Sequence, residues 1–331
     1  MRIGLQASME EDWRATLEKV RIAEDLGVEF ITSGGESWGP SVIPWLAVLA
    51  TNTSKVLLGP SILNVFSRTP ATLAQEFARL DHLSEGRMVL GLGSSGALVI
   101  EHFHGVPFER PLRRLREYIE IFRMLIAGER LEYDGELFKL ERGFRLDYPR
   151  PRTRIPVWIA AITPRSIRQT AAIADGIFPL HWPTKLMPEL RSQLDEGARA
   201  AGRDPSEITL APFTNVFILD GDEDDKKWHE ARQHIHRYVN RMGVFYYQML
   251  ERNGFEAEVT ASRAAWAERD MEGSMRALTD ELVSAIQVIG PLEACGDQLR
   301  ERARLGADMQ MLYMPSGDPQ EVGRTLEALI R

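Results

Sequence analysis

The sequence predicts an α/β protein, a (β/α)8 TIM barrel with insertions. Eight apolar, strand-like runs alternate with amphipathic helix patterns along the 331 residues, and no Pro/Gly/Ser-rich linker divides the chain. Strands that alternate with helices pair in parallel through right-handed crossovers. Eight such units close into a barrel, typically of about 250 residues and sometimes of more than about 400. One enlarged barrel over residues 1–331 is therefore favoured over two domains of about 150 residues each.

The first part of the chain supplies four strand–helix units. We expect strands at residues 2–7, 28–32, 55–63 and 87–92, and helices at residues 12–26, 41–53, 70–83 and 109–127. Gly27 stands just past the end of the first helix, where a left-handed residue is common. Pro70 suits the first turn of the third helix. The apolar residues of the fourth helix follow the spacing of one helical face, namely Leu112, Leu115, Ile119, Phe122 and Ile126.

The rest of the chain supplies four more units and two longer segments. We expect strands at residues 157–160, 176–181, 208–219 and 308–314, and helices at residues 164–174, 185–201, 291–305 and 318–330. Residues 130–148 alternate around Asp134-Gly135, a turn signal, and are expected to form a hairpin. Residues 223–288 are charged and helical in pattern. Both segments exceed the barrel repeat, so we interpret them as insertions.

Composition and charge exclude several classes of protein. The 40 Lys and Arg residues are outnumbered by 48 Asp and Glu residues, and the net charge is −8. The sequence contains no basic stripe, so a nucleic-acid partner is not expected. A single cysteine, Cys295, excludes intrachain disulfides and cysteine-based zinc sites. No apolar run approaches the roughly 18 residues of a membrane span, and the N-terminus shows no signal peptide. We therefore expect a cytoplasmic protein that acts on a small molecule, without membrane or nucleic-acid partners.

A glycine pattern follows the fourth expected strand. Residues 91–96, Gly-Leu-Gly-Ser-Ser-Gly, match G-x-G-x-x-G. A Rossmann loop of this kind follows the first strand and opens a helix directly, whereas the next helix here is expected only near Glu109. Glycines at a strand end still allow backbone N–H groups to approach an anion or a ring. The alternative interpretation is a plain tight turn.

Polar and aromatic residues follow other strands. Glu36 and Trp38 come after the second strand, Asn64 ends the third, and His181-Trp182 ends the sixth. Barrel active sites lie at the carboxyl ends of the strands. A carboxylate or imidazole there can handle a proton, and an indole can stack on a planar ligand. The structural alternative is a surface Glu, a half-buried Trp and simple loops.

Residues 160–165, Ala-Ala-Ile-Thr-Pro-Arg, join the fifth strand to a helix. Helix N-termini bind phosphate through free N–H groups. Thr163 also suits the N-cap position, with Pro164 in the first turn, and the two interpretations are compatible.

The other histidines are not interpreted as a metal site, and a helical stripe is not interpreted as a cofactor site. Glu101-His102-Phe103-His104 lacks a second cluster at ligand spacing, so no metal is expected. His234 and His236 point apart on a helix. The stripe formed by Tyr238, Met242, Phe245 and Met249 predicts a buried face in the core or in an interface rather than a cofactor site.

Taken together, these motifs resemble the bacterial luciferase-like monooxygenase superfamily, and within it the F420-dependent, methylene-tetrahydromethanopterin reductase-like branch. The residues that carry the resemblance are 36–39, 64–68, 90–93, 104–108 and 163–166. It spans nearly the whole chain, and it is most specific over residues 30–182 and least specific over 223–288. It implies a bacterial luciferase-like barrel, a homodimer, and a non-prolyl cis peptide at Asn64-Val65 that backs the ring of the cofactor.

The resemblance also implies roles for individual residues. Catalytic roles are implied for Glu36, His181 and Glu101. Cofactor contacts are implied for Trp38, Asn64, Val65, Gly91, Gly93, Ser94, Ser95, Gly96, Ala161, Ile162, Thr163 and Arg165. Substrate contacts are implied for Ser37 and Trp182. Gln6 departs from the Glu often found in the first strand of the reductases proper, which weakens the case for a pterin substrate.

The function expected from the resemblance is hydride transfer between coenzyme F420 and a small organic substrate. An FMN-dependent monooxygenase that uses molecular oxygen is the first alternative, since both cofactors present a tricyclic ring and a phosphate. A non-catalytic flavin-binding barrel is the second. A Rossmann-type NAD dehydrogenase comes last, because it requires a different fold.

Overall fold

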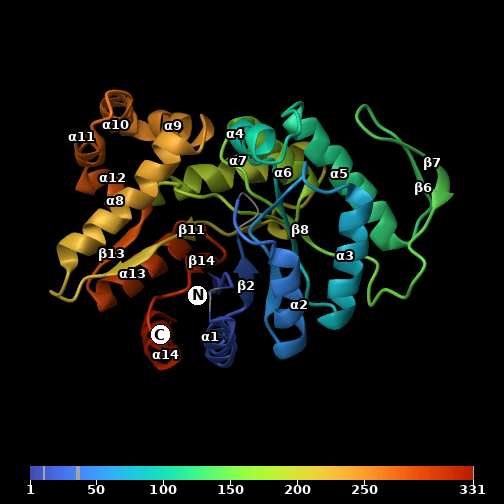
Figure 1. The fold of residues 1–331 in the computed structure, drawn as a ribbon, viewed down its shortest axis with the longest axis horizontal. Helices are drawn as coiled ribbons and strands as arrows, with labels where there is room; N and C mark the ends of the chain where they lie inside the picture. The colour runs from blue at the N-terminus through green and yellow to red at the C-terminus, as the bar shows by residue number, and fades with distance from the viewer. Residues whose placement is uncertain (10–11, 35–37, 331) are drawn as a thin grey trace.

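The protein forms a closed barrel of parallel strands surrounded by helices (Figure 1). The computed structural model describes residues 1–9, 12–34 and 38–330. Two five-stranded sheets, in the orders β11-β14-β1-β2-β3 and β10-β9-β8-β5-β4, make up the barrel wall. The strands are β1 (Ile3–Gln6), β2 (Phe30–Ser33), β3 (Leu57–Pro60), β4 (Leu63–Asn64), β5 (Leu90–Gly93), β8 (Val157–Ile159), β9 (Gly176–Ile177), β10 (Thr209–Leu210), β11 (Phe213–Thr214) and β14 (Gln310–Tyr313).

The two sheets join where barrel strands are interrupted. β3 and β4 are parts of one barrel strand, and so are β10 and β11. Isolated parallel bridges, Leu58 to Met88 and Leu180 to Phe213, connect the sheets at these interruptions. Within the described residues the strands therefore fill eight positions, and the predicted (β/α)8 barrel is confirmed.

Amphipathic helices cover the outside of the barrel. They are α1 (Trp13–Asp25), α2 (Val42–Asn52), α3 (Pro70–Leu83), α5 (Pro111–Ala127), α6 (Pro164–Ile173), α7 (Met187–Ala200), α13 (Leu292–Arg304) and α14 (Pro319–Ile330). Their ends follow local sequence signals. The Asp12 carboxylate accepts N–H groups at the start of α1, Pro70 opens α3, and Gly128 ends α5 in a left-handed conformation. The helix boundaries expected from the sequence agree to within about two residues.

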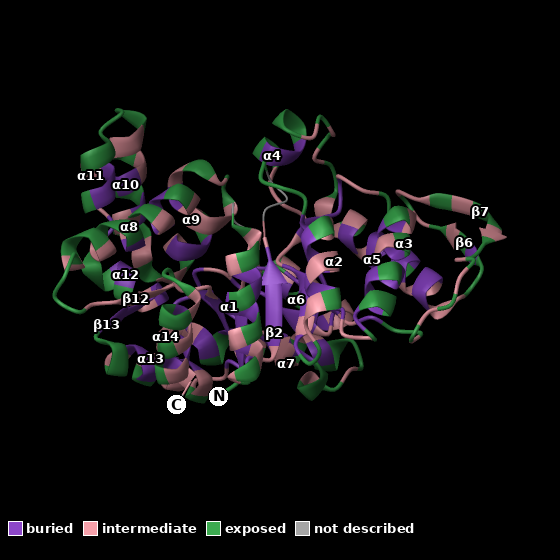
Figure 2. Cartoon of the chain, turned by 60° about the horizontal axis from the view of Figure 1, so that its bottom comes forward, coloured by how far each residue is buried: buried purple, intermediate pink, exposed green. Residues whose placement is uncertain are grey.

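The inside of the barrel is packed with side chains and is not a pore. Inward-facing residues form a cluster of Phe30, Val89, Trp158, Phe178, Ala211, Phe213, Met309 and Met311. The Phe30 and Trp158 rings meet edge to face, with centroids 5.2 Å apart. β2 is buried along its whole length (Figure 2). This packing fills the lower barrel with side chains, below the carboxyl ends of the strands.

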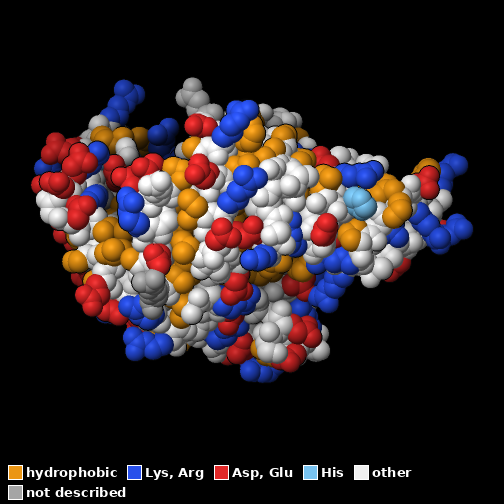
Figure 3. All heavy atoms as spheres, turned by 90° about the horizontal axis from the view of Figure 1, so that it is seen from below, with side chains coloured by type: hydrophobic (Ala, Val, Ile, Leu, Met, Phe, Trp, Pro, Cys, Tyr) orange, Lys and Arg blue, Asp and Glu red, His pale blue; other side chains and the backbone are white. Residues whose placement is uncertain are grey.

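The hairpin of β6 (Leu131–Asp134) and β7 (Lys139–Phe144) projects from one end of the molecule (Figure 1). The buried Glu117 of α5 anchors it, because the two carboxylate oxygens accept the N–H groups of Glu136, Leu137 and Phe138. Acidic and basic side chains are interspersed on the face seen in Figure 3. In the described ranges, no helix combines the length and apolar character needed to cross a membrane.

The second insertion differs in detail from the expectation. It consists of α8 (Asp224–Arg241), α9 (Phe245–Leu250), a turn kinked at Gly254 (Glu251–Phe255), α10 (Glu256–Ala267), α11 (Met271–Arg276) and α12 (Asp280–Ile286). The helical region ends at Ile286, not at residue 288, because Val288–Gly290 forms strand β13. The expected strand at 208–219 is also divided. Pro212 separates β10 from β11, and β12 (Val216–Ile218) leaves the barrel to pair with β13 in parallel.

One short helix was not expected. α4 (Ala97–His102) begins directly after Gly96, whereas the sequence pattern predicts no helix between the strand at 87–92 and residue 109. Its six residues are too few for a helical period to be recognised.

Candidate active site at the barrel mouth

A cavity of about 940 Å³ lies at the carboxyl ends of the barrel strands. Every barrel position contributes to its lining. The contributing residues are Gln6, Gly34, Ser61, Ile62, Asn64, Gly93, Ala160, Phe178, Phe213 and Tyr313. The second insertion adds α8, α9 and the kinked turn at Glu251–Phe255 to the lining, and α4 and α5 also contribute. This is the position at which barrel enzymes place their active sites.

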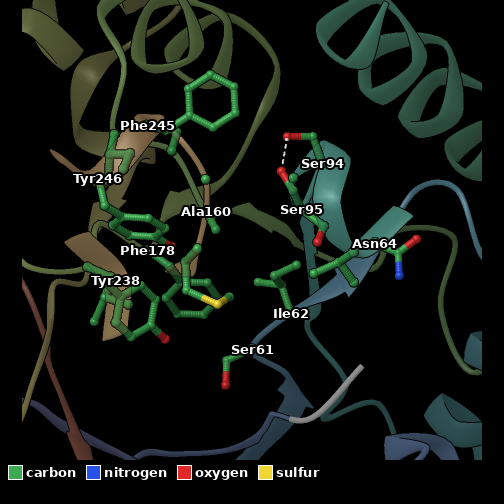
Figure 4. Close-up of a pocket in the computed structure, with 18 of the residues that line it drawn as sticks. Ser61, Ile62, Asn64, Ser94, Ser95, Ala160, Phe178, Tyr238, Phe245 and Tyr246 are labelled. Carbon is green, nitrogen blue, oxygen red and sulfur yellow. Dashed lines mark hydrogen bonds between the residues drawn. The ribbon is translucent and has the colours of Figure 1, made fainter. Parts of the chain in front are cut away.

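The two sides of the cavity differ in character. Figure 4 shows the rings of Phe178, Tyr238, Phe245 and Tyr246 on one side. On the other side it shows Ile62, Asn64, Ser94 and Ser95. A planar ligand between them would meet aromatic rings on one face and small or aliphatic groups on the other.

The interrupted third strand forms part of the second side. A non-prolyl cis peptide joins Ser61 to Ile62, so the expectation of a cis peptide at Asn64-Val65 is wrong. The break in the strand precedes Leu63, and residues 63–64 already pair with β5 as strand β4. Ser61 Oγ lies 3.0 Å from Gln6 Oε1 and 3.1 Å from Thr32 Oγ1, which ties the break to β1 and β2.

Asn64 and Val65 have different positions. Asn64 lines the cavity, and its Oδ1 accepts the N–H groups of Phe66 at 2.9 Å and Ser67 at 2.8 Å. Val65 is 1% exposed and belongs to the hydrophobic core. Asn64 is thus fixed by the turn it caps, whereas Val65 does not reach the cavity.

The glycine pattern divides into a structural and a cavity-lining part. A Cβ added to Gly91 would lie 1.9 Å from the carbonyl oxygen of Pro60, so glycine is required where these two barrel strands approach. Gly91 does not line the cavity. Residues 93–96 do, and Ser95 has a φ of 58°. Gly96 is the N-cap residue of α4.

The 160–166 turn lines the cavity next to these glycines. Thr163 and Ser166 form a capping box, in which the Thr163 Oγ1 accepts the Ser166 N–H and the Ser166 Oγ accepts the Thr163 N–H. Arg165 and Arg168 of α6 also line the cavity. The turn therefore presents a helix N-terminus and two guanidinium groups to the same space.

Imidazole and phenol rings form the wall contributed by α8. His234, Tyr238, Tyr246 and Tyr313 line the cavity. Asn215 Nδ2 lies 3.1 Å from His234 Nδ1, so that nitrogen accepts and the ring proton is on Nε2. Burial, with a further contribution from Arg237, lowers the pKa of His234 to about 4. Burial raises the pKa values of the three tyrosines. At neutral pH this wall offers uncharged hydrogen-bond donors.

His181 lies behind this wall and does not line the cavity. It is 2% exposed, and its ring packs edge to face against His234 and Tyr238, with centroids 5.0 and 4.7 Å away. Burial holds its pKa well below the ordinary value, and His234 lowers it further. Its Nε2 has no hydrogen-bond partner among the described residues. His181 is thus placed to position His234 and Tyr238.

The remaining predicted residues have varied positions. Trp38 lines the cavity and is 53% exposed. Glu101 is exposed outside it, where its Oε1 accepts the Phe108 N–H at 3.2 Å. Trp182 is 4% exposed, and its Nε1 donates to the Leu186 carbonyl. The predictions for Glu36 and Ser37 lie outside the described residues. Ala161 and Ile162, for which cofactor contacts are predicted, line the cavity.

Sequence reasoning missed one helical face. The predicted stripe is divided between two helices, because α8 ends at Arg241 and Phe245 and Met249 belong to α9. Its members Tyr238, Met242 and Phe245 line the cavity, and only Met249 is fully buried. The overlooked signal is the spacing of His234, Arg237, Tyr238 and Arg241, which places an imidazole, a phenol and two guanidinium groups on one face of α8.

Charge in the cavity has a single sign among the described residues. Five arginines line it, namely Arg165, Arg168, Arg237, Arg241 and Arg252, and the described lining contains neither Asp nor Glu. The whole chain has a net charge of −8, so this concentration of positive charge is local. Among the described residues, no group of three or more His, Cys, Asp and Glu side chains has the arrangement of a metal site. The cavity is therefore suited to an anionic organic ligand.

Comparisons with known proteins agree with this geometry. The chain is 26% identical over 322 residues to a 5,10-methylenetetrahydromethanopterin reductase of Archaeoglobus fulgidus, covering 96% of this chain and 94% of that one. It is 28% identical over 352 aligned positions to a putative coenzyme F420-dependent oxidoreductase of Mycobacterium tuberculosis, covering 100% and 99%. The structure of the F420-dependent tetrahydromethanopterin reductase of Methanopyrus kandleri superposes with a TM-score of 0.83 at 23% identity, covering 98% and 97%. The luciferase-like monooxygenase family model matches residues 1–309, and the chain belongs to this family.

Proposed function

We propose that the protein is an oxidoreductase that binds coenzyme F420 at the barrel mouth and transfers hydride between this deazaflavin and a small organic substrate. The observation that best supports the proposal is the arginine-lined cavity, whose described lining contains no carboxylate. Relatives named for F420 or for a reductase that uses it align over nearly the whole chain, which favours the deazaflavin over other ring-shaped anions.

The described residues fit such a cofactor. F420 combines a planar ring system with a phosphodiester and carboxylates, so it needs both flat walls and cationic groups. Ile62, Asn64 and residues 93–96 would hold the ring and its polyol chain. The 160–166 turn, with Arg165 and Arg168, would hold the phosphate through charge-assisted hydrogen bonds and the helix N-terminus.

When bound, the deazaflavin donates or accepts a hydride at C5. The chain then has to orient the substrate, exclude water and supply a proton. His234 is neutral near pH 7 and carries its proton on Nε2, and Tyr238 retains its phenolic proton. We propose that these two groups hydrogen-bond the reacting atom of the substrate. His181 supports them as a positioning residue, Trp38 forms a wall beside the ring, and Glu36 is a proposed proton handler.

A spectrum and two titrations test the proposal. The purified protein is expected to show absorbance near 420 nm if cofactor is retained, and the apo protein is expected to bind added F420 in the micromolar range. With a competent substrate, bound F420 should be oxidised or reduced without oxygen consumption. Absence of F420 binding up to high micromolar concentrations would contradict the proposal.

The same experiment separates the alternatives. Binding of FMN with the two absorbance bands of a flavin, together with oxygen consumption by the reduced complex, would identify a monooxygenase. Binding of either cofactor without hydride exchange with any donor would identify a non-catalytic barrel.

We also propose a homodimer located in the cytoplasm. The free and buried Cys295 is consistent with a reducing compartment. Light scattering after size-exclusion chromatography should give twice the mass of the 331-residue chain, and a monomer would contradict the dimer.

A further inference from the structure

The five arginines of the cavity fall into two groups on different elements. Arg165 and Arg168 belong to α6, which follows β8, whereas Arg237, Arg241 and Arg252 belong to the second insertion. In the strand order of the barrel, β8 lies across from β1. Arg237 lies near the β1 side, because its neighbours include Trp38, which follows β2, and Tyr313, at the end of β14. Arg237 therefore faces the cavity from the side opposite α6.

Arg237 occupies the part of the cavity in which we place the substrate. Its guanidinium carbon lies 5.3 Å from the centre of the Trp38 ring. It is close enough to His234, Tyr238 and Tyr313 to affect the pKa values of all three. His234 and Tyr238 are the two groups proposed above to contact the reacting atom. A ligand group bound by Arg237 would therefore lie close to His234 and Tyr238.

No acidic group neutralises this cation within the described residues. Arg237 forms no ion pair with a described residue, although other arginines of the chain are paired, such as Arg232 with Asp280 and Arg152 with Asp81. The neighbouring imidazole and phenol groups are uncharged at neutral pH. Arg241 and Arg252 add two more positive charges to the same wall. An arginine that has no carboxylate partner among the described residues and lies beside an aromatic wall is suited to bind an oxyanion of a ligand.

We infer that the substrate carries an oxyanion group, a carboxylate or a phosphate, which Arg237 binds with support from Arg241 and Arg252. The inference rests on the proposed function, because it assigns the opposite arginines, Arg165 and Arg168, to the cofactor. The aromatic rings around the site favour a substrate whose anionic group is attached to a flat or apolar body.

Three probes of similar size test the inference. Benzoate and benzamide have nearly the same shape but differ in charge, and phenyl phosphate replaces the carboxylate by a phosphate. Each is titrated calorimetrically into the F420-loaded protein and into the apo protein. We expect benzoate to bind at least about tenfold more tightly than benzamide, the effect of one charge-assisted hydrogen-bonded pair. The ratio between benzoate and phenyl phosphate identifies which oxyanion the site prefers.

Variants then assign the preference to Arg237. In Arg237→Gln the benzoate and benzamide affinities should agree within about threefold, and Arg237→Lys should keep part of the preference because it keeps the charge. The affinity for F420 should stay within about twofold of that of the original protein. Arg276→Gln is the matched control, since it removes the same charge from an exposed side chain of α11 outside the cavity. Circular dichroism confirms that each variant is folded.

The outcomes separate this inference from the proposed function. Equal binding of benzoate and benzamide, or binding of neither, would overturn the oxyanion site even if F420 binds. A loss of F420 affinity in Arg237→Gln, with the benzoate preference unchanged, would assign Arg237 to the cofactor and also overturn it. A benzoate preference that depends on Arg237 in a protein that does not bind F420 would support the oxyanion site and refute the proposed cofactor.

Discussion

Replacement of His234 by Gln should flatten the dependence of stability on pH. His234 is held at the cavity wall by Asn215 and packs against the rings of His181 and Tyr238. Burial, and secondarily the charge of Arg237, lowers its pKa to about 4 in the folded protein. The folded state therefore disfavours the proton that the unfolded chain accepts readily.

The expected size of the effect on stability follows from the pKa values of His234 in the folded and unfolded states. In the unfolded chain a histidine has a pKa of about 6.5, and one pKa unit corresponds to about 1.36 kcal/mol. Because the folded pKa is the lower one, the stabilising contribution is complete above pH 6.5 and is lost as the pH falls towards 4. Between pH 7 and pH 5 the loss from this one residue is about 2 kcal/mol. Gln keeps a hydrogen-bonding group for Asn215 and does not titrate.

Urea unfolding at pH 7 and pH 5 measures this contribution. The free energy of unfolding of His234→Gln should fall by about 2 kcal/mol less over this interval than that of the original protein. His181 is more deeply buried and has its own lowered pKa, so a part of the pH dependence should persist in the variant. His229→Gln is the matched control, because His229 is exposed on the same helix. If His234→Gln loses as much stability between the two pH values as the original protein, the assignment of a neutral, buried imidazole is wrong.

Three further substitutions test the packing and the cofactor site. Gly91→Ala places a Cβ 1.9 Å from the Pro60 carbonyl oxygen, so urea unfolding should show a loss of about 2 kcal/mol or more. Ser274→Ala removes the hydroxyl that lies 2.9 Å from the buried His236 Nε2, and should cost about 1–3 kcal/mol in the same assay while leaving F420 affinity unchanged. Arg165→Gln should lower the affinity for F420 about tenfold in a fluorescence titration and leave benzoate binding unchanged. An unaltered F420 affinity would place the phosphate elsewhere.

The barrel could be predicted from the sequence because each unit repeats the same local signals. Amphipathic helices of ten or more residues, such as Pro111–Ala127, and short apolar runs between them are periodic enough to be recognised individually. The interruptions could not be predicted from pattern alone. Pro212 signals the break between β10 and β11, but pairing of Val216–Ile218 with Val288–Gly290 joins segments some 70 residues apart.

The candidate site was predictable where it depends on strand ends and less so elsewhere. Residues 93–96 and 161–165 line the cavity because they directly follow β5 and β8. Gly91 belongs to the same glycine motif as residues 93–96, and Val65 follows the cavity-lining Asn64. Gly91 lies where two strands meet and Val65 lies in the core, so neither lines the cavity. The face of α8 was misinterpreted, because an aromatic stripe on a helix has the same spacing whether it contacts a core or an open cavity. Only the arginines at positions 237 and 241 distinguish the two.

The division of the cavity between barrel and insertion has a consequence for specificity. Residues that follow β4, β5 and β8 build the side proposed for the cofactor, and they are constrained by strand pairing and by close contacts such as that of Gly91 with Pro60. The α8 wall lies outside the closed sheet, is joined to the barrel through β12 and β13, and is held by side-chain packing such as that of His234 on His181. Substitutions on α8 can therefore change the chemical class of the substrate while the cofactor side keeps its geometry. In this chain that wall presents arginines and neutral rings, which is why we infer an anionic substrate from the insertion and not from the barrel.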